Sequence, residues 1–137
     1  MHALYYNTTA ASNTAIGYGG MHLNTTGACN VAVGKMVLYA NTTGNRNTAT
    51  GSYALCANTT GYYNVAIGDA AVKSNTTGLT NTGVGLAALE ANTTACDNTA
   101  IGGFALLSNT TGTQNAAHGS CSLRTNTTGI RLSLIHI

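Results

Sequence analysis

Four cysteines and four histidines are the side chains that first suggest metal binding in this chain of 137 residues. Tetrahedral zinc needs ligands that converge on one point, and pairs spaced as C-x-x-C are the usual sign of such a site. No two cysteines are spaced in that way; they are Cys29, Cys56, Cys96 and Cys121. The sequence therefore predicts no metal site, no cofactor and no disulfide ladder.

The chain has three carboxylate side chains, Asp69, Glu90 and Asp97. Catalysis needs a nucleophile, a base and an orienting group, or paired carboxylates, at one place. These carboxylates occupy three different positions of the repeat described below, so no such group forms. We therefore expect that the chain is not an enzyme.

Tyrosines are the surface residues with the most promise for binding. Tyr18, Tyr39 and Tyr63 stand at positions of the repeat that also hold charged residues, and Tyr62 adjoins Tyr63. Aromatic rings displayed in this way could bind a glycan or a protein. Their irregular spacing leaves chance decoration open as the alternative.

The chain contains Asn-Thr-Thr eight times, and every step between copies is 17 residues. The copies begin at Asn7, Asn24, Asn41, Asn58, Asn75, Asn92, Asn109 and Asn126. The consensus is N-T-T-G-x-x-N-T-A-I-G-x-x-A-L-x-x, and residues 17 apart form a column, numbered from the first Asn. A fixed short period indicates coils stacked by one small translation. The sequence thus predicts an all-β parallel β-roll or β-solenoid of about eight coils.

Columns 8 to 10 predict a strand, because β-branched residues prevail in columns 8 and 10. Column 9 holds only Ala or Gly, so we expect another backbone close to that face, and a strand apolar on both faces is buried on both. We therefore expect column 9 to contact sister chains. These interface candidates are Ala15, Ala32, Ala49, Ala66, Gly83, Ala100 and Ala117.

Column 15 is apolar in every coil and predicts a ladder of core side chains. Its members are Leu4, Met21, Leu38, Leu55, Val72, Leu89, Leu106 and Leu123. The connector G-x-x-A-L-x-x around it could be a strand or a single helical turn, since Ala and Leu also suit helix. All eight charged residues fall in columns 6, 12 and 16, which we expect to face water. Lys73 and Glu90, both in column 16, should form an exposed ion pair.

Composition excludes several classes of protein. Only 6% of residues are charged and the net charge is +2, so no nucleic-acid footprint is present. No apolar run approaches the ~18 residues of a membrane span, so we expect no membrane insertion by this segment. Each coil offers about two large apolar side chains, too few to offset the ordering of its backbone. We therefore expect a homo-oligomer.

Four segments resemble the N-S-V-A-I-G core of the head repeats of trimeric autotransporter adhesins, the YadA-like head family. They are Asn13–Gly17, Asn30–Gly34, Asn64–Gly68 and Asn98–Gly102. The resemblance covers residues 1–131 and extends to repeat arrays of bacterial surface and phage tail-fibre proteins. It implies a left-handed β-roll, a homotrimer, and an extracellular place on a bacterial surface or phage virion. Host matrix proteins or glycans are the partners it implies.

The two ends depart from the repeat. Met1 falls in mid-unit and no signal peptide is predicted, so we expect a fragment of a longer, capped array. Residues 132–137 read LSLIHI where N-T-A-I-G was due. This hexapeptide resembles a translated sequencing adapter. We therefore divide the chain into a repeat domain, residues 1–131, and a non-repeat tail, residues 132–137.

These observations predict a structural or adhesive repeat domain of a surface fibre or adhesin head, which presents or spaces a binding tip. Ice binding by threonine ladders is the alternative. Adjacent threonines in columns 2 and 3 should point to opposite sides, which leaves one outward ladder. Each Asn-Thr-Thr is also formally a glycosylation acceptor, but stacked amides and hydroxyls at a turn explain the motif better.

Overall fold

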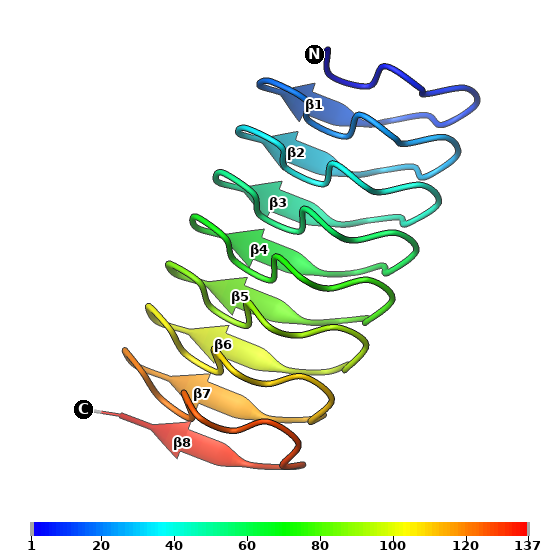
Figure 1. Ribbon diagram of the computed structural model, residues 1–137. Coiled ribbons are helices and arrows are strands. Elements are labelled where there is room, and N and C mark those ends of the chain that lie inside the picture. The colour runs from blue at the N-terminus through cyan, green and yellow to red at the C-terminus, as the bar shows by residue number, and fades with distance from the viewer. Residues whose placement is uncertain (1, 137) are drawn as a thin grey trace.

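The structure is a computed structural model that describes residues 2–136. Within this range the chain winds into a β-solenoid, in which eight short strands form one parallel sheet in sequence order (Figure 1). The β-branched residues of columns 8 and 10 favour this extended segment. The strands are β1 Thr14–Ile16, β2 Val31–Val33, β3 Thr48–Thr50, β4 Val65–Ile67, β5 Thr82–Val84, β6 Thr99–Ile101, β7 Ala116–His118 and β8 Ser133–Ile135.

The register of the sheet equals the sequence repeat. Ala32 pairs with Ala49, Ala49 with Ala66, and every other strand residue likewise with the residue 17 positions later. Adjacent strands of a sheet lie about 4.8 Å apart, so the stack rises by that distance per coil. The predicted parallel β-solenoid and its 17-residue stacking are confirmed.

The ion pair expected in column 16 is present. Lys73 Nζ lies 3.6 Å from Glu90 Oε1, and the two side chains are 44% and 34% exposed. An exposed pair of this kind contributes at most about 1 kcal/mol. Its value here is as a marker that residues of one column are neighbours.

The connector is neither of the two expected structures, because residues 2–136 contain no helix and the connector forms no strand. No helix within that range is therefore long and apolar enough to cross a bilayer. The connector instead turns through left-handed residues: all eight members of column 15 have φ between 48° and 55°. Such a conformation costs an L-residue roughly 1–2 kcal/mol. Closing a coil within 17 residues requires these sharp turns, and at column 15 they direct a large side chain inward.

Column 11 shows why glycine follows each of the strands β1 to β7. Gly17 has φ 122° and Gly34 has φ 140°. A Cβ added to Gly17 would lie 2.3 Å from the carbonyl oxygen of Gly34 in the next coil. Any side chain at this column would therefore force neighbouring coils apart.

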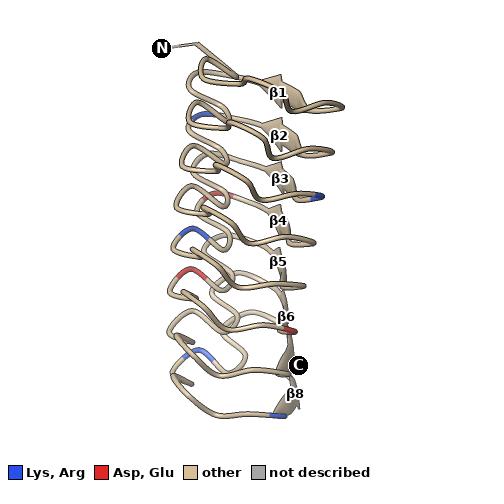
Figure 2. Cartoon of the chain, turned by 90° about the vertical axis from the view of Figure 1, so that its right-hand side faces the viewer, with Lys and Arg blue, Asp and Glu red and all other residues tan. Residues whose placement is uncertain are grey.

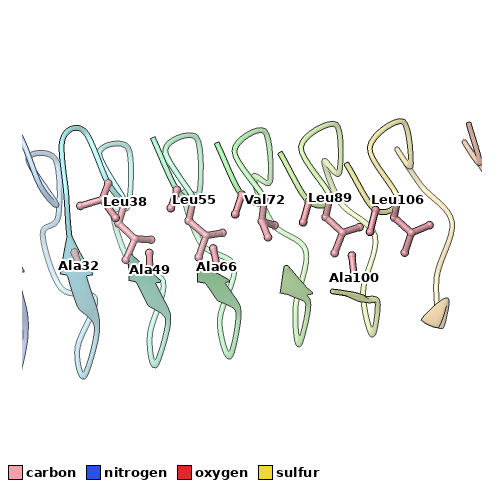
Figure 3. Close-up of a cluster of buried hydrophobic side chains, with 14 of the residues drawn as sticks. Ala32, Leu38, Ala49, Leu55, Ala66, Val72, Leu89, Ala100 and Leu106 are labelled. Carbon is pink, nitrogen blue, oxygen red and sulfur yellow. The ribbon is translucent and has the colours of Figure 1, made fainter. Parts of the chain in front are cut away.

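The core is a narrow space between two opposite walls of each coil. The leucines of column 15 face the alanines of column 9, which stand on the strands (Figure 3). Met21, Leu38, Leu55, Val72, Leu89 and Leu106 are fully buried, and the terminal Leu4 and Leu123 are partly buried.

The expectation that column 9 contacts sister chains is wrong. Ala32, Ala49, Ala66, Ala100 and Ala117 are fully buried within a single chain, so no other chain can reach them. The backbone that approaches them belongs to the opposite wall of the same solenoid. A Cβ added to Gly83 would lie 2.6 Å from Val72 Cγ2 and 3.1 Å from the carbonyl oxygen of Ala88.

The outward face of the strands is uncovered in the single chain, contrary to the expectation of burial on both faces. Columns 8 and 10 point outward, and Ile16, Ile67 and Ile101 are 60%, 43% and 41% exposed. His118 is the only ionisable side chain of these columns within the eight strands. The sheet therefore presents a flat, nearly charge-free stripe along the whole stack, named the outward face below.

Two ladders of asparagine amides run through the interior. In column 1, Asn58 Nδ2 donates to Asn41 Oδ1 at 2.9 Å and to the carbonyl oxygen of Gly61 at 3.0 Å. In column 7, Asn47 Nδ2 donates to Asn30 Oδ1 at 3.2 Å and to the Gly61 carbonyl oxygen at 2.9 Å. No buried side-chain nitrogen or oxygen among the described residues lacks a partner. The ladders thus satisfy amides that would otherwise be costly to bury.

The tail continues the sheet. Ser133–Ile135 form β8, and Leu134 pairs with Ala117 in register. Backbone hydrogen bonds need no particular side chain, which explains why the sheet extends past residue 131. Leu134 nevertheless stands where every earlier coil has Ala or Gly, and it is exposed. Met1 and Ile137, which belong to the predicted domain and tail, lie outside the described residues.

Candidate functional site

The four predicted tyrosines lie at three separate places on the solenoid. Tyr18 stands at the turn after β1, Tyr39 on the connector, and Tyr62 and Tyr63 at the corner before β4. Only Tyr62 and Tyr63 are brought together, with ring centroids 5.4 Å apart and planes at 74°. They are 41% and 48% exposed.

Tyr39 belongs instead to an aromatic file in column 16. Its ring stacks on His22 at 5.4 Å with planes 7° apart, and His22 stacks on Tyr5 at 5.3 Å with planes 17° apart. Each ring covers a face of its neighbour, and what remains for a ligand is mainly ring edge. We therefore interpret this file as a contact between the first coils and not as a binding platform.

The corner beside Tyr62 and Tyr63 also contains Arg46. Arg46 Nη1 donates to the hydroxyl oxygen of Tyr63 at 2.7 Å, and the guanidinium lies 5.4 Å from the centroid of the Tyr63 ring. Both residues are in column 6, one coil apart. The stacking of coils therefore assembles a cation and an aromatic pair from separate repeats.

These side chains line a surface hollow of about 370 Å³, named the corner pocket here. Its residues come in pairs from columns 5 and 6 of three successive coils, directly before β2, β3 and β4: Ala28, Cys29, Asn45, Arg46, Tyr62 and Tyr63. The exposed Asn45 is fixed by two hydrogen bonds: its Oδ1 accepts from the Ala28 amide at 2.8 Å and its Nδ2 donates to the Thr43 carbonyl oxygen at 2.8 Å. The volume falls within the range of small-molecule sites.

The charge around the corner pocket is positive. Arg46 has no carboxylate partner among the described residues. The next charged residue in column 6 is Asp97, three coils away, and it accepts a hydrogen bond from the Thr80 hydroxyl. In Figure 2 the same edge accordingly carries blue beside β3 and red beside β6. An anionic ligand would meet no repulsion at this corner.

The chain contains a second arginine–aromatic pair that lacks a pocket. Arg124 lies with its guanidinium 5.6 Å from the Phe104 ring centroid, on the opposite, connector side of the solenoid. A second hollow, lined by Ser74, Glu90, Ala91, Leu107 and Ser108, holds no cation and no aromatic ring. Of these two hollows, the corner pocket is the one that combines a cation with aromatic rings.

The thiols and carboxylates do not converge. The four cysteines are unpaired thiols, and the described residues contain no group of three or more His, Cys, Asp or Glu that could hold a metal ion. Burial raises the pKa of the Cys56 thiol, and the charge of Lys73 opposes that shift in part. A raised pKa disfavours the thiolate, which is the reactive form.

Sequence reasoning found Tyr62 and Tyr63 but missed Arg46 and Asn45. The repeat phase already contained the signal, because Arg46 stands 17 residues before Tyr63 and Asn45 stands 17 before Tyr62. No family model matches the chain, and no curated protein or solved structure matches it. The assignment of function therefore rests on the residues themselves.

Proposed function

We propose that the chain is a rod segment of a surface-exposed fibre or adhesin head, built from three copies side by side, that presents or spaces a binding tip. The observation that supports this proposal is the outward face. It exposes a large apolar side chain on five of the eight strands, β1, β2, β4, β6 and β8, along one stripe: Ile16, Val31, Ile67, Ile101 and Ile135. Such a stripe on a soluble protein is typical of an interaction surface.

Further copies of the same chain are the partner that fits the outward face best. Every coil presents a three-residue strand in the same register, so only a stack with the same period can match it coil for coil. The near absence of charge disfavours nucleic acid and suits the close packing of apolar side chains. The number three, and a place on a bacterial surface or phage virion, are supported by the resemblance to trimeric adhesin heads.

Sedimentation velocity at micromolar concentration tests the assembly. We expect a trimer for the unaltered chain. Joint substitution of Ile67→Lys and Ile101→Lys should yield monomers of unchanged circular dichroism, because charges would replace apolar contacts at the centre of the face. Leu86→Lys is the matched control, since Leu86 is an exposed apolar residue on another edge. A monomeric parent chain, or equal dissociation by the control, would contradict the proposal.

The adhesive and the spacer versions of this function differ in one measurement. The isolated chain should bind immobilised extracellular-matrix proteins or glycans if it is adhesive, and should bind neither if it only spaces a tip. If the chain forms a trimer but binds no matrix protein or glycan, the rod function stands and the adhesive role is rejected.

Ice binding remains a second candidate because of column 3. Thr26, Thr43, Thr60, Thr77, Thr94 and Thr111 are exposed at regular steps, whereas the column 2 hydroxyls donate to a carbonyl of the next coil, as Thr42 does to Thr59 at 3.1 Å. Only one outward threonine ladder results from the motif. Thermal hysteresis that is lost on Thr60→Lys would support this function, and a lack of hysteresis in the parent chain would reject it.

A further inference from the structure

We propose that the corner pocket binds a carboxylated sugar, with Arg46 holding the carboxylate and the rings of Tyr62 and Tyr63 contacting the sugar ring. The proposal deepens the adhesive version of the proposed function, on which it rests, and names its ligand class. It starts from the juxtaposition of a cation and two exposed rings in a hollow of about 370 Å³.

The guanidinium of Arg46 retains donors for a ligand. A guanidinium has five N–H groups in a planar fork. One is used by the Tyr63 hydroxyl, and the described residues offer the side chain no other hydrogen-bond partner. A carboxylate matches two parallel N–H groups of the fork, which gives orientation as well as charge pairing.

The two tyrosines provide an apolar corner for the rest of the ligand. Their rings stand at 74° to one another, so they form two walls rather than one flat stack. A pyranose ring has an apolar face of C–H groups and a rim of hydroxyls. The C–H face can pack on one ring, while the Tyr62 hydroxyl, for which the structure gives no partner, can bond a sugar hydroxyl.

The charge and size of the corner pocket select this class over others. A single cation matches the single negative charge of a carboxylate and does not match the several charges of a phosphate chain or nucleic acid. The hollow accommodates one or two sugar rings and is too small for a folded protein. Sialic acids and uronic acids share this chemistry, and the experiment below separates them.

One copy of this site should bind weakly, because the cation is exposed and screened by water. We expect dissociation constants of about a millimolar for a single sugar, as for other small polar ligands. If the chain is a trimer, three equivalent sites would raise the apparent affinity for a clustered glycan surface. Weak single sites therefore suit a fibre that adheres through many contacts.

Titration of the ¹⁵N-labelled full chain, followed by amide chemical shifts, tests the proposal. Sialyllactose and a hyaluronan tetrasaccharide are the two acidic probes, and lactose is the neutral one. We expect one or both acidic probes to shift the amides of residues 28–29, 45–46 and 62–63, with lactose at least about tenfold weaker. Arg46→Gln should weaken the acidic probe about tenfold, and Arg46→Lys by less, because Lys keeps the charge but loses the fork.

Arg124→Gln is the matched control, because it removes the arginine of the pair without a pocket. It should leave the titration unchanged. Lactose binding as tight as sialyllactose, an equal loss in Arg124→Gln, shifts located elsewhere, or no shift with either acidic probe up to about ten times the expected constant would each overturn the proposal. Sedimentation of the same sample reports the assembly separately, so a failed sugar site leaves the rod function standing.

Discussion

The two asparagine ladders and the corner between them differ in how much sequence variation they tolerate. Columns 1 and 7 repeat asparagine in every coil up to Asn126 and Asn115, and their amides lie inside the solenoid. Columns 5 and 6 lie between them and hold a different pair of residues in each of the eight coils. Interactions that repeat by translation require identical residues, whereas a corner in water does not. A specific site can therefore evolve at the corner without disturbing the stack.

Of the substitutions that test this comparison, Asn58→Asp should lower the free energy of unfolding the most. The Nδ2 of Asn58 donates to Asn41 Oδ1 and to the Gly61 carbonyl oxygen, so an oxygen in its place would face two acceptors and carry a buried charge. We expect the free energy of unfolding to fall by about 3–5 kcal/mol. Chemical denaturation measures it, and Asn45→Asp at the exposed corner is the control, with a loss below about 1 kcal/mol. Equal losses would remove the distinction between ladder and corner.

A coupled pair in the core comes next. Column 9 has Gly83 where other coils have Ala, and column 15 has Val72 where most have Leu. Because a Cβ at Gly83 would lie 2.6 Å from Val72 Cγ2, Gly83→Ala should cost about 1–3 kcal/mol by overpacking. Val72→Leu together with Gly83→Ala recreates the usual pair and should restore at least the parent stability. A double-mutant cycle with no coupling would show that the two substitutions are independent.

Backbone strain at column 13 gives a smaller effect. Ala70 has φ 54° and Gly19, in the same column, has φ 68°. Ala70→Gly should stabilise the chain by up to about 0.5–1 kcal/mol, because glycine adopts this conformation without steric cost. Gly19→Ala should destabilise by a similar amount. Melting temperatures of the two variants should move in opposite directions, and a shift in the same direction would show that side-chain contacts outweigh the backbone.

The smallest change in stability should come from replacing the corner residues of one coil by those of the next coil. Tyr62→Leu with Tyr63→Thr reproduces the pair Leu79-Thr80 of the next coil. We expect the free energy of unfolding to change by less than about 0.5 kcal/mol, because these side chains are exposed. Binding of the acidic sugar should be lost in the same variant. A large loss of stability would mean that the corner also holds the coils together.

The period of 17 residues was enough to predict the stack, its register and the Lys73–Glu90 pair, because translation leaves no freedom in which residues touch. The period was not enough to predict which face of the strands lines the core. Alternation places columns 8 and 10 on one face and column 9 on the other, and it does not say which of the two faces packs inside the solenoid. The alanines signalled a close backbone correctly, but that backbone was the opposite wall of the same chain.

The connector could not be predicted for a different reason. Leucines such as Leu38 and Leu55 adopt left-handed backbone that their type disfavours, since burial of the side chain outweighs the local cost. Conformational propensity reflects only the local backbone cost and not the burial of the side chain. At the corner pocket, by contrast, the repeat was sufficient to predict that Arg46 and Tyr63 are neighbours in adjacent coils. Their hydrogen bond depends on side-chain rotamers, which the sequence does not give.

The column 1 ladder has a direction. Asn24 donates its amide hydrogen to Asn7, Asn41 donates to Asn24, and the same sense holds at Asn126, which donates to Asn109. The oxygen that accepts each hydrogen always belongs to the coil that leaves the ribosome first. Each new turn of a nascent chain can therefore dock on an acceptor oxygen that the preceding coil already presents, and the solenoid can wind in the order of its synthesis.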